Sequence, residues 1–151
     1  MPEACPVGFY CPLGNFITPC PIATYSDLEF RSKTLTTFLI YSQHRPYQHH
    51  IVATVEDCSP CPAGYFCNDT AISVYTHWPC PVGAYCLIGS LSPTVCPNSS
   101  VSLLAGASAL SNCTDCPAGF YCTDPSVSIR CPPGFFCPTS SSAPEPCPGI
   151  K

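Results

Sequence analysis

Apolar residues in this chain come in short runs, and no run carries the long periodic pattern of an amphipathic helix. The longest apolar stretch, Phe38 to Tyr41, is far shorter than the about 18 residues that indicate a membrane helix. With the residues before it, it forms an uncharged, β-prone window at 34–41, of the kind that promotes aggregation. The pattern predicts short β-hairpins with little regular secondary structure and no membrane span.

Composition changes this picture by adding cysteine. The 151 residues include 15 Cys and 20 Pro, and only 9% are Asp, Glu, Lys or Arg, where a globular domain has about 25%. So small a charged fraction and so thin an apolar core disfavour a conventional cytosolic α/β enzyme. Five basic residues and a net charge of -4 disfavour a nucleic-acid binder. We therefore expect a small disulfide-rich fold.

Two further features concern the compartment. Three N-glycosylation sequons, at Asn68, Asn98 and Asn112, favour an oxidising, extracellular setting and glycosylation at these sites. No signal peptide is visible, because Met1 to Ala4 lead directly into Cys5 without a basic or an apolar segment. We expect the signal to lie upstream, in a larger secreted or membrane-anchored protein.

One heptapeptide, Cys-Pro-x-Gly-x-aromatic-Cys, occurs five times, beginning at Cys5, Cys61, Cys80, Cys116 and Cys131. Its Pro suits the second position of a β-turn, and its Gly suits the fourth position of a type I turn or a positive φ. We expect the aromatic residue before the second cysteine to pack on a disulfide or on the next repeat. The alternative is an exposed ligand-binding row. These aromatic residues are Tyr10, Phe66, Tyr85, Tyr121 and Phe136.

A longer period lies above the heptapeptide. Cys58, Cys61 and Cys67 recur 55 residues later, and Cys80, Cys86 and Cys96 recur 51 residues later. This divides the chain into the C-terminal half of a cysteine-rich repeat (1–27), an insertion or mobile loop (28–57), a cysteine-rich repeat (58–112) and a repeat truncated at its end (113–151).

The heptapeptide with interleaved Cys-x-x-Cys pairs resembles the ephrin-receptor-like cysteine-rich repeat. It is similar, more distantly, to tumour necrosis factor receptor and EGF-like modules. The resemblance covers most of 5–20 and 58–147, and implies an extracellular, elongated rod of tandem disulfide-linked repeats. Two turns depart from the pattern, because Ala23 replaces Gly after Cys20, and the turn after Cys96 lacks both the Gly and the aromatic residue. We expect these two turns to be looser.

Six cysteines can pair in fifteen ways, so spacing alone leaves the connectivity open. The receptor-like frame implies two single loops and two sets of crossed bridges. These pairs are Cys20–Cys58, Cys61–Cys80, Cys67–Cys86, Cys96–Cys113, Cys116–Cys131 and Cys122–Cys137. The same frame leaves Cys5, Cys11 and Cys147 for partners outside the chain. A bridge closing about 15 residues contributes roughly 3 kcal/mol, so reduction should unfold the rod.

The segment between Cys20 and Cys58 is longer than its counterpart between Cys96 and Cys113. About 20 residues are extra, roughly 29–52, and they include His44, His49 and His50. A mobile loop or extra hairpin, a non-native segment and a functional site all stay open for this insertion.

Two Cys-x-x-Cys pairs, Cys58–Cys61 and Cys113–Cys116, could serve as zinc ligands. However, each heads its own repeat and four other cysteines intervene, so disulfides are favoured. We find no supported catalytic constellation and no calcium loop, and therefore predict no catalytic residue, metal or cofactor. The predicted function is a non-enzymatic extracellular spacer or interaction module whose partners are other extracellular protein domains. The alternatives are a ligand-binding receptor ectodomain and a zinc-binding thiol protein.

Overall fold

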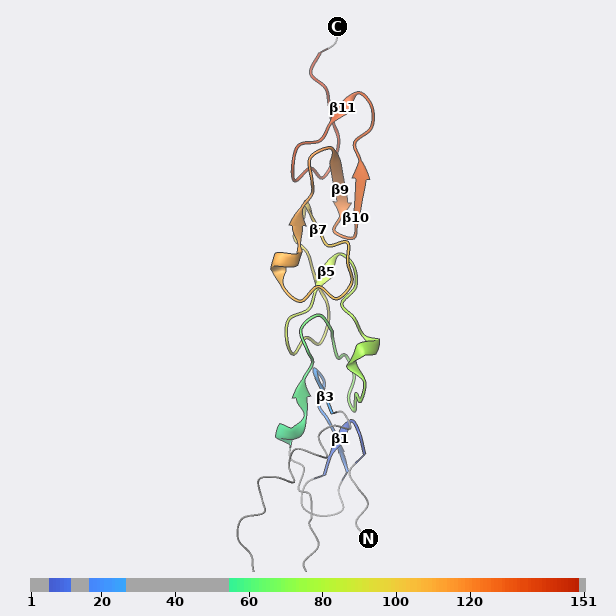
Figure 1. The fold of residues 1–151 in the computed structure, drawn as a ribbon, viewed down its shortest axis with the longest axis vertical. Coiled ribbons are helices and arrows are strands. Elements are labelled where there is room, and N and C mark those ends of the chain that lie inside the picture. The colour runs from blue at the N-terminus through green and yellow to red at the C-terminus, as the bar shows by residue number, and fades with distance from the viewer. Residues whose placement is uncertain (1–5, 12–16, 27–54, 150–151) are drawn as a thin grey trace, which may run out of the picture.

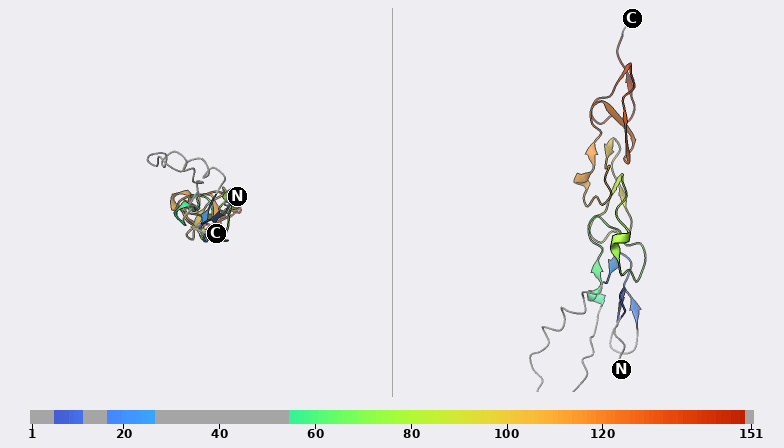
Figure 2. Two further views of the ribbon diagram at one scale, coloured as in Figure 1. Left: turned by 90° about the horizontal axis from the view of Figure 1, so that it is seen from below. Right: turned by 45° about the vertical axis from the view of Figure 1, so that its right-hand side comes forward.

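The computed structural model describes residues 6–11, 17–26 and 55–149, which form a narrow rod with the two ends of the chain at opposite ends (Figure 1). Successive segments follow one another along the long axis, and the view along that axis shows a small cross-section (Figure 2). The prediction of a small disulfide-rich fold of elongated tandem repeats with short hairpins is confirmed. The four predicted domain ranges stay a prediction.

The repeating unit is one antiparallel hairpin. The described residues contain six two-stranded sheets and one isolated bridge, between Tyr65 and Pro79. Each hairpin begins at a Cys-Pro pair and ends just before a later Cys-Pro pair, so we call it a module. Modules 1 to 7 comprise residues 5–19, 20–60, 61–79, 80–95, 96–115, 116–130 and 131–146.

The strands are short. Their pairs are β1 (Phe9–Tyr10) with β2 (Thr18–Pro19), β3 (Thr24–Tyr25) with β4 (Ser59–Pro60), β5 (Ala84–Tyr85) with β6 (Thr94–Val95), β7 (Ser100–Val101) with β8 (Thr114–Asp115), β9 (Phe120–Asp124) with β10 (Val127–Arg130), and β11 (Phe135–Phe136) with β12 (Glu145–Pro146). The described 3-10 helices are η1 (Val55–Asp57), η2 (Tyr75–His77) and η3 (Leu110–Asn112).

The turn that opens each module starts one residue later than the sequence predicted. In module 3 the Tyr65 amide donates to the Pro62 carbonyl at 3.1 Å, and Gly64 lies between them with φ 88°. Pro is therefore first and Gly third in a turn of type II, which needs a positive φ at that place. The prediction of Gly at the fourth position of a type I turn is wrong.

The two divergent turns keep the same geometry. Ala23 and Ser99 both have φ 65°, and the next residue still donates to the proline carbonyl at 3.2 Å in each turn. The expectation of looser turns is therefore not met, because two non-glycine residues adopt the left-handed conformation.

Neighbouring modules are joined by backbone hydrogen bonds. Between modules 3 and 4 the four donor–acceptor pairs are Gly64 to Cys86 (2.8 Å), Cys80 to Gly64 (2.8 Å), Gly89 to Cys61 (2.7 Å) and Cys67 to Ser90 (2.9 Å). Equivalent sets of four join modules 2 and 3, 4 and 5, and 6 and 7. Among the described residues, two such hydrogen bonds join modules 1 and 2 and two join modules 5 and 6. Each of the other four junctions fixes one hairpin on the next at four points.

Turn glycines also allow close contact between modules that have one other module between them. A Cβ added to Gly64 of module 3 would lie 2.7 Å from the Gly106 carbonyl oxygen of module 5, and one added to Gly83 would lie 2.8 Å from the Ser126 amide nitrogen of module 6. Asp124 fixes Ser126 there, because the Ser126 amide and hydroxyl both donate to its Oδ1. These hydrogen bonds hold the pKa of the Asp124 carboxyl below its ordinary value.

Disulfides take the place of a hydrophobic core. The large side chains with less than 2% exposure are all cysteines: Cys20, Cys61, Cys67, Cys80, Cys86 and Cys116. Small clusters of aromatic side chains surround these cysteines at the junctions. Tyr25 of module 2 lies edge-on to Tyr75 of module 3 with ring centroids 4.7 Å apart, and both pack on a cluster of Cys61, Cys67 and Ile72.

The predicted packing of the aromatic residue on a disulfide is confirmed for Phe66, and three of the other four positions are half-buried. Phe66 packs on the Cys80–Cys86 cluster and against Trp78, and Tyr10, Tyr85 and Tyr121 are half-buried. Phe136 differs, since it is 41% exposed. The residue that precedes this aromatic residue in the heptapeptide also packs on the buried clusters. The sequence did not lead us to expect this. The repeated aromatic residues at that place, among them Tyr65 and Phe120, were the signal that could have found it.

Candidate functional site

All twelve cysteines predicted to form bridges within the chain are paired. The disulfides are Cys20–Cys58, Cys61–Cys67, Cys80–Cys86, Cys96–Cys113, Cys116–Cys122 and Cys131–Cys137. The two single loops agree with the receptor-like frame. The four crossed bridges are wrong, because each opening turn brings its own two cysteines to a Cα separation of 5.8–5.9 Å, well within disulfide range.

The three cysteines assigned to outside partners have different outcomes. Cys11 is disulfide-bonded, so its assignment is wrong. Cys5 lies outside the described residues. Cys147 is an exposed free thiol, and its outside partner stays a prediction.

In each candidate zinc pair the two cysteines belong to two different disulfides, so their thiolates cannot bind a metal ion together. Cys58 is bonded to Cys20 and Cys61 to Cys67, and the second pair is divided in the same way. No group of His, Cys, Asp or Glu in the described ranges could hold a metal ion. His44, His49, His50 and the window at 34–41 lie outside those ranges. Within the described part, no helix is long and apolar enough to cross a membrane.

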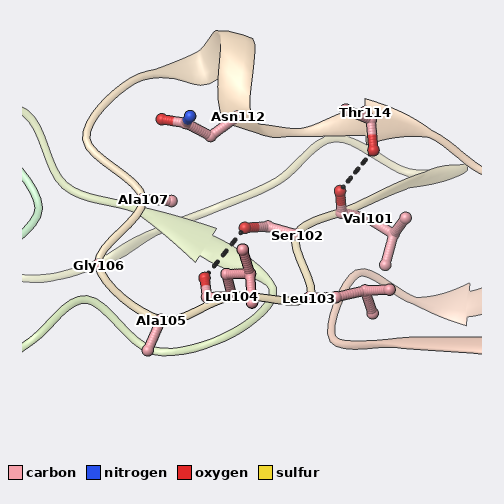
Figure 3. Close-up of a pocket in the computed structure, with 9 residues that line it drawn as sticks. All are labelled: Val101, Ser102, Leu103, Leu104, Ala105, Gly106, Ala107, Asn112 and Thr114. Carbon is pink, nitrogen blue, oxygen red and sulfur yellow. Dashed lines mark hydrogen bonds between the residues drawn. The ribbon is translucent and has the colours of Figure 1, made fainter.

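The side chains of Asn68, Asn98 and Asn112 are exposed, and their glycosylation stays a prediction. Asn112 differs from the other two in its surroundings. It ends η3 and lies at the edge of a hollow of about 390 Å³ in module 5 (Figure 3).

The hollow is lined by one loop of module 5 and by the helix and strand that follow it. Its lining residues are Val101, Ser102, Leu103, Leu104, Ala105, Gly106, Ala107, Asn112 and Thr114. Val101 is 3% exposed and belongs to the cluster around Cys116 and Cys122. Leu103 and Leu104, in contrast, are 55% and 81% exposed. The hollow therefore has a fixed base and an open apolar rim.

Hydrogen bonds of Asn112 and Thr114 connect the residues around this hollow. The amides of Ser108 and Ala109 both donate to Asn112 Oδ1, each at 3.0 Å. The Thr114 hydroxyl donates to the Val101 carbonyl at 3.3 Å (Figure 3). The Asn112 amide is thereby held in place through its oxygen, and the loop is closed on itself by Cys96–Cys113.

The residues that line the hollow carry no charge. Between His77 and Asp115 the sequence has no Asp, Glu, Lys, Arg or His. Several large apolar side chains in this stretch are nevertheless exposed, among them Leu87, Ile88 and Val95. The hollow is thus suited to an uncharged group with both apolar and polar faces.

No family model matches the chain, and no curated protein matches it.

Proposed function

We propose that this chain is a stiff, non-enzymatic spacer in the extracellular part of a larger secreted or membrane-anchored protein. Its modules would be cysteine-rich repeats of the ephrin-receptor-like kind. The disulfides favour an oxidising environment, since such bonds persist there. The single observation that carries the proposal is the junction between modules.

At four of the described junctions, four backbone hydrogen bonds resist hinge motion, because bending there would break several of them together. The contact of Gly64 with module 5 and that of Gly83 with module 6 add a second restraint that spans two junctions. Stiffness is therefore a property of the backbone, and it needs no large apolar core. This holds two attached domains at a set distance.

The receptor alternative predicts exposed aromatic residues and loops that cluster on one side of two adjacent units. Of the five heptapeptide aromatics only Phe136 is exposed, while Tyr10, Phe66, Tyr85 and Tyr121 are half-buried. The spacer function is therefore the better supported of the two.

Small-angle X-ray scattering on the oxidised protein tests the proposal. A compact domain of 151 residues would have a radius of gyration of about 15 Å. We expect a clearly larger value and the scattering of a thin rod, unchanged when salt is raised. A compact particle, or the profile of a flexible chain, would rule out a stiff spacer.

A further inference from the structure

We propose that an N-linked glycan on Asn112 places its first sugar in the hollow of module 5 and covers Leu103 and Leu104. This rests on the proposed function in one respect, since attachment requires the secretory compartment. The predicted sequon says only that Asn112 can be modified. The geometry assigns the glycan a place on the protein and a role there.

The first step of the argument concerns the asparagine itself. Its Oδ1 accepts from the amides of Ser108 and Ala109, so the orientation of the side chain is set and Nδ2 is the atom left for attachment. In the covalent step Nδ2 bonds to the anomeric carbon of a sugar carried by a lipid diphosphate. The lipid diphosphate leaves, and Nδ2 loses one proton. Both Oδ1 hydrogen bonds can persist in the product, because the bond is made at nitrogen.

The second step concerns what lies within reach of that nitrogen. Asn112 and Leu104 border the same hollow from opposite sides (Figure 3). N-acetylglucosamine has an apolar ring face, an acetyl methyl group and hydroxyl groups. The lining offers exposed apolar side chains together with the exposed Thr114, and none of its residues is charged. The chemistry of the hollow therefore matches a neutral sugar.

The third step concerns exposure. Leu104 is 81% exposed, in a stretch without charged residues that would keep it from associating with other molecules. The corresponding loop of module 3 begins with the polar residues Asn68, Asp69 and Thr70, so a glycan on Asn68 has no leucine at the positions that Leu103 and Leu104 hold in module 5. Asn68 is the matched control.

The test uses the full chain from cells that keep glycans high-mannose, trimmed enzymatically to one N-acetylglucosamine per site. Glycopeptide mass spectrometry should find Asn112 occupied. Nuclear Overhauser contacts should join its acetyl methyl to the methyl groups of Leu103 or Leu104. Asn112→Asp removes the sequon and keeps the Oδ1 acceptor.

Asn112→Asp should increase the binding of an uncharged apolar dye, and adding Leu104→Ser should remove the increase. Asn68→Asp should change nothing. The inference fails if Asn112 is unoccupied while Asn68 is occupied, if the acetyl methyl has no contact with either leucine, or if the two Asp variants bind dye equally. None of these results touches the spacer function, which depends on the scattering.

Discussion

The third position of the opening turn decides how each module meets its neighbours. Gly64, Gly83, Ala23 and Ser99 all have a positive φ at this position. The N–H of the cysteine that opens the next module donates to the carbonyl of this residue in each case. One backbone conformation therefore sets both the turn and the junction.

Ala23→Gly should stabilise the protein. L-residues resist the left-handed conformation that Ala23 adopts at φ 65°, and glycine does not. After allowing for the greater freedom of glycine in the unfolded chain, we expect the free energy of unfolding to rise by about 0.5–1 kcal/mol. Chemical denaturation of the oxidised protein measures this. Ala63→Gly, in the equivalent turn but without a positive φ, should give no gain. An equal effect at both positions would contradict the strain at Ala23.

Gly64→Ala should cost more than Gly119→Ala. The two glycines have φ 88° and 84°, so the conformational penalty is shared. Only the Cβ at Gly64 meets the backbone of module 5, while that at Gly119 has nothing within 4 Å. We expect an additional loss of about 1–3 kcal/mol for Gly64→Ala. Thermal unfolding of the two variants checks this. Equal losses would show that modules 3 and 5 do not make this contact.

At the scale of the element, a module is a hairpin closed by one disulfide. In modules 3, 4, 6 and 7 the bond closes the opening turn, and its two cysteines are separated by 6 positions in sequence. In modules 2 and 5 it closes the long loop, as in Cys20–Cys58 and Cys96–Cys113. In the unfolded protein, the two kinds of disulfide close loops of different length.

Removal of Cys20–Cys58 should therefore destabilise the protein more than removal of Cys116–Cys122. The separations are 38 and 6 residues, for which chain entropy gives about 3.9 and about 2.2 kcal/mol. Paired Cys→Ala variants compared by denaturation measure the difference. All four cysteines are buried, so the loss of packing is matched. A larger cost for the short loop would contradict the entropic account.

At the scale of the whole molecule, stability is spread along the rod as a series of hairpins and junctions. Such arrays gain stability from each unit and from each nearest-neighbour interface. Here the units depend on their disulfides, because the buried clusters are small and consist largely of cysteine.

Reduction should accordingly unfold the rod. Six described disulfides and the bonded Cys11 leave no more than two of the 15 cysteines as free thiols. We expect a thiol count on the denatured, unreduced protein within that limit. Peptide mapping at low pH should find Cys80 linked to Cys86. After reduction, dispersed NMR amide signals should collapse. A reduced chain with unchanged spectra would mean that apolar packing carries the fold.

The sequence by itself determined the fold class. The repeated heptapeptide places a turn after each Cys-Pro pair, and the small charged and apolar content makes disulfides the main source of stability. The resemblance of the motif to the ephrin-receptor-like repeat also implied the two disulfides that close long loops, Cys20–Cys58 and Cys96–Cys113. These features are local or compositional, so periodicity reveals them.

Only the tertiary structure decided the remaining pairs, because a linear spacing does not tell whether modules stack or lie side by side. In the rod Cys61 pairs with Cys67 and Cys80 pairs with Cys86. End-to-end stacking also brings Gly64 against module 5, whereas the folding of module 5 itself places Asn112 and Leu104 at one hollow. The contact of Gly64 joins backbones distant in sequence, and it depends on how the junction hydrogen bonds orient one hairpin on the next.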